Sequence, residues 1–161
     1  EGEQHFEALR LELLDLYLNH LAVKTTLFAG IEALLGQIED DGLHWGIVTN
    51  KPRIYTEAIL CALELDLRCQ TVVCPDDVTH TKPHPEPLLL ACAQIPCSPE
   101  EAIYIGDHRR DIEAGKNAGM ITIAAAYGYI DPGDPIATWQ ADHTINKATD
   151  ATQILQHYAG L

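Results

Sequence analysis

The sequence predicts an α/β fold built on a parallel sheet that helices cover on both faces. Short apolar segments alternate with amphipathic segments along most of the 161-residue chain, which is typical of βαβ units with parallel strands. Polar side chains also follow two of the apolar segments directly, at Thr49 and Asp107. In a parallel sheet such positions meet at the carboxyl edge, where ligands bind. We therefore expect a ligand site at that edge.

Helices are expected where apolar residues recur every three or four positions. The first, residues 5–23, carries two apolar stripes on nearly opposite faces, one through Phe6 and Leu13 and the other through Leu14 and Leu21. A helix that is apolar on two faces packs between two partners. An N-terminal helix in a dimer interface is the alternative. Further helices are expected at residues 30–40, 53–65, 88–94, 110–118 and 150–158.

Strands are expected where short apolar runs, several of them rich in β-branched residues, lie between turn signals. These runs are residues 43–48, 71–74, 102–105, 120–126 and 141–145. A polar loop, residues 75–87, separates the second strand from the next helix, and it contains several prolines. Prolines restrain the backbone of this loop before any side chain in it is placed.

Composition narrows the class of protein. Ten basic and 24 acidic residues give a formal net charge of -14 and a sequence pI near 4.7, which repels nucleic acid and anionic membranes. We therefore expect neither as a partner. The five cysteines are odd in number and form no CxxC pair, so reduced thiols are expected rather than a disulfide or zinc framework. Together these features favour a single compact cytoplasmic domain.

Two carboxylates, Asp107 and Asp111, lie four residues apart across a predicted junction between a strand and a helix. Gly106 lets the backbone at this junction turn close to a ligand. Carboxylate oxygens suit Mg²⁺, which takes one or two protein carboxylates together with substrate phosphate. In the alternative interpretation, Asp107 caps the helix and Asp111 is solvated. Asp107 and Asp111 are thus the candidate metal ligands.

Three residues upstream are candidates for binding phosphate. Thr49 and Asn50 end a strand and can donate hydrogen bonds to a phosphoryl group, although Thr-Asn is also ordinary turn chemistry. Lys82 lies between Thr81 and Pro83, and a positioned ammonium stabilises developing phosphoryl charge. A lone loop lysine is more often solvated. Taken with the carboxylates, the order of these residues predicts phosphoryl-transfer chemistry.

Histidines form a second group of potential ligands, at His80, His84 and His108. Imidazole is a poor partner for the hard cation that Asp107 implies. We therefore expect no histidine metal site.

The order of the motifs resembles that of the haloacid dehalogenase superfamily. Thr-Asn follows one strand, Lys-Pro lies in a later loop and Gly-Asp-x-x-x-Asp follows a third, and the resemblance runs through nearly the whole chain. The segments 48–52, 82–87 and 112–120 look like the phosphoglycolate phosphatase branch. Residues 6–12, together with 127–130 and Trp139, look closer to bacterial N-acetylmuramic acid 6-phosphate phosphatases.

The resemblance implies a Mg²⁺-dependent phosphatase of small phosphorylated metabolites that works through an aspartyl-phosphate. Thr49 and Asn50 would hold phosphoryl oxygens, and Lys82 would neutralise the nucleophile and the phosphoryl charge. Asp107 would ligate Mg²⁺ with support from Asp111. The family's nucleophile and acid–base aspartates lie on its first strand, and nothing before Thr49 supplies them. We therefore expect this chain alone to be inactive and to bind Mg²⁺ weakly or not at all.

The resemblance also implies a domain organisation. Residues 1–25 would be the last helix of a helical cap, and residues 26–161 a Rossmann-like three-layer core that lacks its first, central strand and most of the cap. Removing a central strand unpairs two neighbours, and each exposed edge invites new pairing. We expect a rearranged sheet, a strand-swapped homodimer, or an N-terminal segment supplied separately. An intact sheet with no foreign strand would contradict this view.

Other functions fit the sequence less well. A natural non-catalytic domain that keeps the fold for binding or assembly is the main alternative. A response-regulator receiver places its acidic residues before the threonine and lysine, whereas Asp107 follows them. Carbon–halogen hydrolysis on the same fold does not need the metal that Asp107 and Asp111 suggest. The sequence does not specify a substrate; Tyr127, Tyr129 and Trp139 either border the site or pack in the core.

Overall fold

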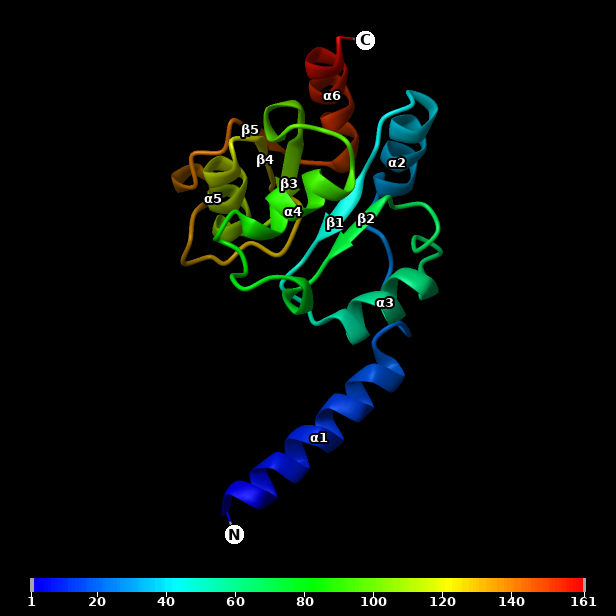
Figure 1. Ribbon diagram of the computed structural model, residues 1–161, viewed down its shortest axis with the longest axis vertical. Coiled ribbons are helices and arrows are strands. Elements are labelled where there is room, and N and C mark those ends of the chain that lie inside the picture. The colour runs from blue at the N-terminus through cyan, green and yellow to red at the C-terminus, as the bar shows by residue number, and fades with distance from the viewer. Residues whose placement is uncertain (1, 161) are drawn as a thin grey trace.

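The computed structural model describes residues 2–160 of the chain, without the side chains of a few residues in the first helix. Figure 1 shows a body of strands and helices from which α1 (Gly2–His20) projects at one end, with the C-terminus at the opposite end. None of the helices in this described part is long and apolar enough to cross a membrane.

Five short strands form the centre of the body, and all observed pairings are parallel. They are β1 (Gly46–Val48), β2 (Thr71–Val73), β3 (Ile103–Gly106), β4 (Ile121–Ala125) and β5 (His143–Ile145). They make two separate sheets, one of β1 and β2 and the other of β3, β4 and β5 in that order. The parallel α/β class predicted from sequence is confirmed.

The division of the sheet lies between β1 and β3. Each of these strands pairs on one side only within residues 2–160, and all four residues of β3 are half-buried whereas four of the five in β4 are buried. A side-chain hydrogen bond links the two edges: the Tyr104 hydroxyl donates to the Val48 carbonyl oxygen at 3.0 Å. The strands have therefore not re-paired with each other across the gap.

Helices cover both faces of the strands. They are α2 (Ile31–Asp40), α3 (Arg53–Ala62), α4 (Glu86–Gln94), α5 (Arg109–Ala118) and α6 (Ala151–Ala159). On one side, Leu34 of α2 and Ala151 of α6 pack with Ile123 of β4. Since side chains alternate between faces along a strand, Ala124 points the other way, and it packs with Ile112 of α5. Leu88 of α4 lies on that second side, completing three layers.

All the helices and strands predicted from sequence are present, with shifts at their ends. The first helix lies three residues earlier than expected at both ends, and α3 ends three residues early. The first strand, expected over residues 43–48, is paired only over its last three residues. Leu43 and Trp45 pack instead against the cluster around α2. The apolar stripe of α1 lacks the expected second partner within the described residues, because Phe6, Leu9, Leu13 and Leu16 are exposed.

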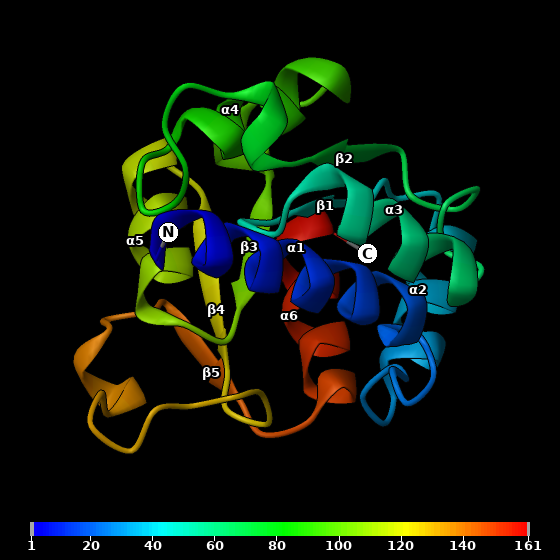
Figure 2. The same cartoon turned by 90° about the horizontal axis from the view of Figure 1, so that it is seen from below.

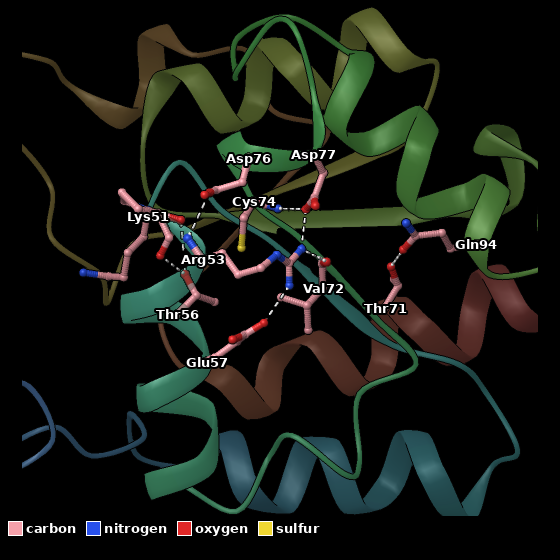
Figure 3. A network of polar contacts seen from close by, with 11 residues as sticks. Lys51, Arg53, Thr56, Glu57, Thr71, Val72, Cys74, Asp76, Asp77 and Gln94 are labelled. Atoms are coloured by element: carbon pink, nitrogen blue, oxygen red, sulfur yellow. Dashed lines mark hydrogen bonds and ion pairs between the residues drawn. The ribbon is translucent and has the colours of Figure 1, made fainter. Parts of the chain in front are cut away.

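A polar network fixes α3 to the end of β2, as Figure 3 shows. The Arg53 guanidinium donates to the Val72 carbonyl oxygen at 3.2 Å and forms ion pairs with Asp77 and Glu57. Asp77 also accepts a hydrogen bond from the Cys74 backbone at 2.8 Å. That backbone bond, together with Arg53, lowers the pKa of the Asp77 carboxyl below its usual value. The network braces the segments that follow β1 and β2.

Candidate active site

Lys82 is the centre of the candidate site. Its side chain is buried, with only 8% of the residue exposed, although it comes from a polar loop. The ammonium group donates to the Val48 carbonyl oxygen and to the Tyr104 hydroxyl, both at 2.7 Å, and it forms an ion pair with Asp111 Oδ1 at 2.9 Å. A buried charge is costly unless it is paired and hydrogen-bonded, and here three oxygens satisfy it. The solvated-lysine alternative is therefore wrong.

Asn50 holds the backbone of Lys82 in place. Its side-chain amide donates to the Lys82 carbonyl oxygen at 3.0 Å and accepts from the Lys82 amide at 3.2 Å. Both ends of the Asn50 amide are thus occupied by one residue, 32 positions along the chain. The observed task of the Asn50 side chain is to position Lys82. Its proposed contact with phosphate stays a prediction.

The two carboxylates lie beside the carboxyl end of β3 and differ in their surroundings. Asp111 is buried, and its second oxygen accepts from the His108 backbone at 3.1 Å. Asp107 is half-buried, and one of its oxygens accepts from the Tyr129 backbone at 2.9 Å. No hydrogen bond from residues 2–160 reaches its other oxygen. His108 caps α5 with its own side chain, so Asp107 is not the helix cap.

Two glycines leave room for the two aspartates to pack directly against the backbone: Gly106 for Asp111, and Gly128 for Asp107. A Cβ atom at Gly106 would lie 2.3 Å from Asp111 Cβ, and one at Gly128 would lie 2.3 Å from Asp107 Cβ. Neither distance is physically tolerable, because carbon atoms in contact lie at 3.5–4.0 Å. Gly106 was expected from sequence to permit a close approach. Gly128 was not expected to, because its neighbour in space is 21 positions away in the chain.

Thr49 directly follows β1, next to the carbonyl group of Val48 that Lys82 contacts. Its backbone amide extends the parallel ladder by donating to Val73 at 3.0 Å. Its hydroxyl oxygen accepts from the Lys51 amide at 3.0 Å, which leaves the hydroxyl hydrogen available to a ligand. Thr49 is therefore linked to Lys82 only through the neighbouring Val48 carbonyl group, and Asp111 contacts the same ammonium group.

Tyr104 is a site residue that the sequence analysis missed. It sits in β3, within a segment expected only to form a strand, and its hydroxyl contacts both Lys82 and Val48. Burial, and then the negative charges of Asp111 and Asp107, raise the pKa of the Tyr104 hydroxyl well above its usual value. It therefore stays protonated and donates to Val48. Nothing in a strand pattern distinguishes such a tyrosine from a core residue.

The residues present fit Mg²⁺ in part. Both candidates offer the hard carboxylate oxygens that Mg²⁺ prefers, and Asp107 has an oxygen that no group in residues 2–160 uses. Asp111 is already satisfied by Lys82 and His108, so it suits a supporting role rather than direct ligation. Asp107 is consequently the better candidate for a direct ligand.

Aromatic residues lie beside Asp107. The Phe28 ring contacts the rings of Tyr127 and Tyr129, with centroid distances of 5.5 and 5.7 Å. Tyr129 is largely exposed, whereas Trp139 is buried among Ile112 and Ala124. Burial, and secondly the Asp107 charge, raise the pKa of the Tyr127 hydroxyl. Tyr127 and Tyr129 thus border the site, and Trp139 packs in the core.

Comparison with known proteins identifies the family. The profile of the haloacid dehalogenase-like hydrolases matches residues 1–125. The chain belongs to the haloacid dehalogenase-like hydrolase family. It is 47% identical over 149 residues to an N-acetylmuramic acid 6-phosphate phosphatase from Pseudomonas aeruginosa, covering 92% of this chain and 66% of that protein.

Two further relatives agree with this assignment. A phosphoglycolate phosphatase from Xanthomonas campestris strain 8004 is 41% identical over 141 residues, covering 88% of this chain and 64% of that protein. A crystal structure of a predicted phosphoglycolate phosphatase from Haemophilus somnus matches with a TM-score of 0.81 and 26% identity, covering 88% of this chain and 63% of the other. The chain thus spans about two thirds of the length of these relatives.

Proposed function

We propose that this chain is the larger part of a Mg²⁺-dependent phosphatase of small phosphorylated metabolites, of the phosphoglycolate phosphatase branch. The observation that carries the proposal is the buried Lys82, whose ammonium group faces Asp111 at 2.9 Å and whose backbone is held by the Asn50 side chain. Removing a charged group from water costs several kcal/mol of desolvation free energy, about the scale that its partners must offset. The position of Lys82 at the carboxyl ends of β1 and β3 is where ligands bind in parallel sheets.

Each residue has a proposed task. The Thr49 hydroxyl would donate to a phosphoryl oxygen, assisted by Asn50, and Lys82 would neutralise the charge that develops on the phosphoryl group. Asp107 would hold Mg²⁺, with Asp111 orienting Lys82 from behind. When bound, Mg²⁺ would supply positive charge to the phosphoryl oxygens. The phosphatase names of two relatives support this assignment.

We further propose that the nucleophile comes from outside this chain and forms an aspartyl-phosphate. The divided sheet supports this, because β1 and β3 each have an edge that nothing in residues 2–160 pairs with, and Lys82 lies at the end of the gap between them. A strand filling the gap would end beside Lys82. The segment that carries the nucleophile would come from a separate N-terminal piece. A second copy in a strand-swapped homodimer would fill the gap without supplying the aspartate, because its sequence is the same. On this view residues 1–25 belong to a cap and residues 26–161 to the core.

The substrate that we propose is a sugar phosphate rather than the smaller phosphoglycolate. The exposed rings of Phe28 and Tyr129, next to Asp107, offer an apolar surface to a sugar ring. The Pseudomonas aeruginosa relative, which acts on N-acetylmuramic acid 6-phosphate by its name, is also more similar to this chain than the Xanthomonas campestris relative.

The five unpaired thiols support a cytoplasmic location.

Hydrolysis of p-nitrophenyl phosphate by residues 1–161 with Mg²⁺ tests the absence of a nucleophile. We expect no turnover above buffer. Turnover that Asp107→Ala abolishes would show that a nucleophile lies within the chain, and the proposed division of the site would be wrong.

A further inference from the structure

A second cluster of metal-ligating side chains lies on the loop that carries Lys82 and on the first residue of α4, away from the candidate active site. His80, His84 and Glu86 each present one ligand atom, and these three atoms lie within 4.8 Å of one another. Lys82 points inward and is buried, whereas the side chains of His80 and His84 are 61% and 50% exposed. The two groups therefore lie on opposite sides of one loop.

The spacing of the cluster suits a small metal ion. His80 Nδ1 lies 2.9 Å and His84 Nδ1 lies 3.9 Å from Glu86 Oε2. Ligands at about 2.0–2.1 Å around a tetrahedral ion are about 3.3 Å apart. The observed distances bracket this value, although His84 Nδ1 accepts from the Glu86 backbone amide at 3.2 Å. Rotation of the imidazole rings, whose terminal torsions are soft, would break this bond and bring all three atoms to ligand distance.

The carboxylate of this cluster is already held in place. Glu86 accepts from the backbone amides of Thr79 and His80, both at 2.9 Å. The Thr79 bond first, and then the His80 side chain, lower the pKa of the Glu86 carboxyl below its usual value. The group is thus ionised and oriented before any ion arrives, and the loop prolines Pro83 and Pro85 limit the backbone motion around it.

We propose that His80, His84 and Glu86 form a binding site for a borderline divalent transition metal such as Zn²⁺. Two imidazoles and one carboxylate are a ligand set for this class of ion, with a fourth position left to water or another ligand. We expected no histidine site because imidazole is a poor ligand for the hard cation that Asp107 implies. In the structure the two histidines pair with Glu86, and His108 serves as a helix cap instead. Because the ligands flank Lys82 in sequence, a bound ion would brace the Lys82 loop.

Isothermal titration calorimetry of the metal-free chain with Zn²⁺ tests the site. The absorption spectrum of Co²⁺ bound in place of Zn²⁺ reports which type of ligand holds the ion. We expect one Zn²⁺ per chain, with His80→Ala and His84→Ala each weakening the affinity about tenfold or more. His44→Ala is the matched control, because His44 is also exposed but lies outside the cluster, and it should leave the affinity unchanged. Thermal unfolding without metal checks that each variant is folded.

Three results would overturn the proposal. The first is no Zn²⁺ binding by the unmodified chain. The second is binding that both histidine variants retain, or a Co²⁺ spectrum with the intense charge-transfer bands of cysteine thiolate ligands. The third is loss of Zn²⁺ binding in Asp107→Asn, which would place the ion in the candidate active site. Unchanged binding in Asp107→Asn is the expected result, and it holds whether or not the phosphatase proposal is correct.

Discussion

At the scale of single residues, the ion pair of Lys82 and Asp111 is the feature whose removal should cost most. Their exposed fractions are 8% and 6%, so removing one partner leaves the other charge buried. We expect Lys82→Met to lower the free energy of unfolding by about 3–5 kcal/mol, measured by urea denaturation. The double variant Lys82→Met with Asp111→Asn should lose less than the sum of the single variants, by at least about 1 kcal/mol. A loss in the double variant equal to the sum of the two single losses would contradict the ion pair between Lys82 and Asp111.

Asn50 allows a second prediction at this scale. Asn50→Ala removes two hydrogen bonds to the Lys82 backbone and should lower the free energy of unfolding by about 1–3 kcal/mol. Asn117→Ala is the matched control, because Asn117 makes a single, longer bond of 3.3 Å to Pro83 of the same loop. Urea denaturation of both variants makes the comparison. An equal loss in the two variants would show that Asn50 is not the clamp.

The sequence predicted Lys82 and Asp111 as site residues. It could not predict that Lys82 is buried, which only the structure shows. A loop lysine looks the same in a sequence whether it is solvated or buried. The contacts that decide the matter come from Val48 and Tyr104, 34 and 22 positions away in the chain. Such partners follow from the packing of whole strands, not from local spacing.

At the scale of elements, two helix-interior glycines should respond to alanine in opposite directions. A Cβ at Gly36 in α2 meets nothing within 4 Å, whereas one at Gly115 in α5 would lie 2.6 Å from Thr122 Cγ2. Gly36→Ala should raise the free energy of unfolding by about 0.5–1 kcal/mol, and Gly115→Ala should lower it by about 1–3 kcal/mol. Chemical denaturation distinguishes the two. A loss in Gly36→Ala would contradict the open surroundings of that position.

The Asp77 network should make the attachment of α3 sensitive to acid. The pKa of the folded Asp77 carboxyl is below its unfolded value, so its stabilising effect is complete above the unfolded pKa, near 3.9, and is lost as the pH falls through the lower folded pKa. We expect Asp77→Asn to be less stable than the unmodified chain at pH 7, with a difference that shrinks as the pH falls from about 5 to 3. Thermal unfolding across this range measures it.

Asp66→Asn controls for the loss of one charge in that experiment, because Asp66 is exposed and makes no hydrogen bond to any group in residues 2–160. A constant difference between Asp77→Asn and the unmodified chain over this pH range would show that the carboxylate contributes nothing through ionisation.

Element positions were predictable because apolar periodicity records which side of each segment is buried. The pairing of the strands was less predictable. The segment 43–48 has a strand pattern throughout, but only Gly46–Val48 pair, since a strand with one neighbour has fewer hydrogen bonds to hold its ends. The α1 pattern predicted two packed faces, and one of them is exposed, because periodicity indicates that a face is apolar without saying what covers it.

At the scale of the whole molecule, the divided sheet is what most sets this chain apart from a complete α/β core. The family resemblance led us to expect two strands without a shared neighbour, and the sheet is divided between β1 and β3. Figure 2, seen from below, shows α1 in front of these strands. Which of the proposed segments fills the gap does not follow from residues 1–161, because neither strand edge specifies its partner.

The central claim is that a nucleophile added at the gap completes a phosphatase site. It is tested by the Mg²⁺-dependent hydrolysis of p-nitrophenyl phosphate by the chain mixed with a synthetic peptide, a run of β-branched residues followed by Asp-x-Asp. A peptide with the first aspartate replaced by asparagine is the matched control. We predict turnover only with the aspartate peptide, and loss of that turnover in Asp107→Asn. Equal turnover with both peptides, or none with an aspartate peptide shown to bind, would contradict the account.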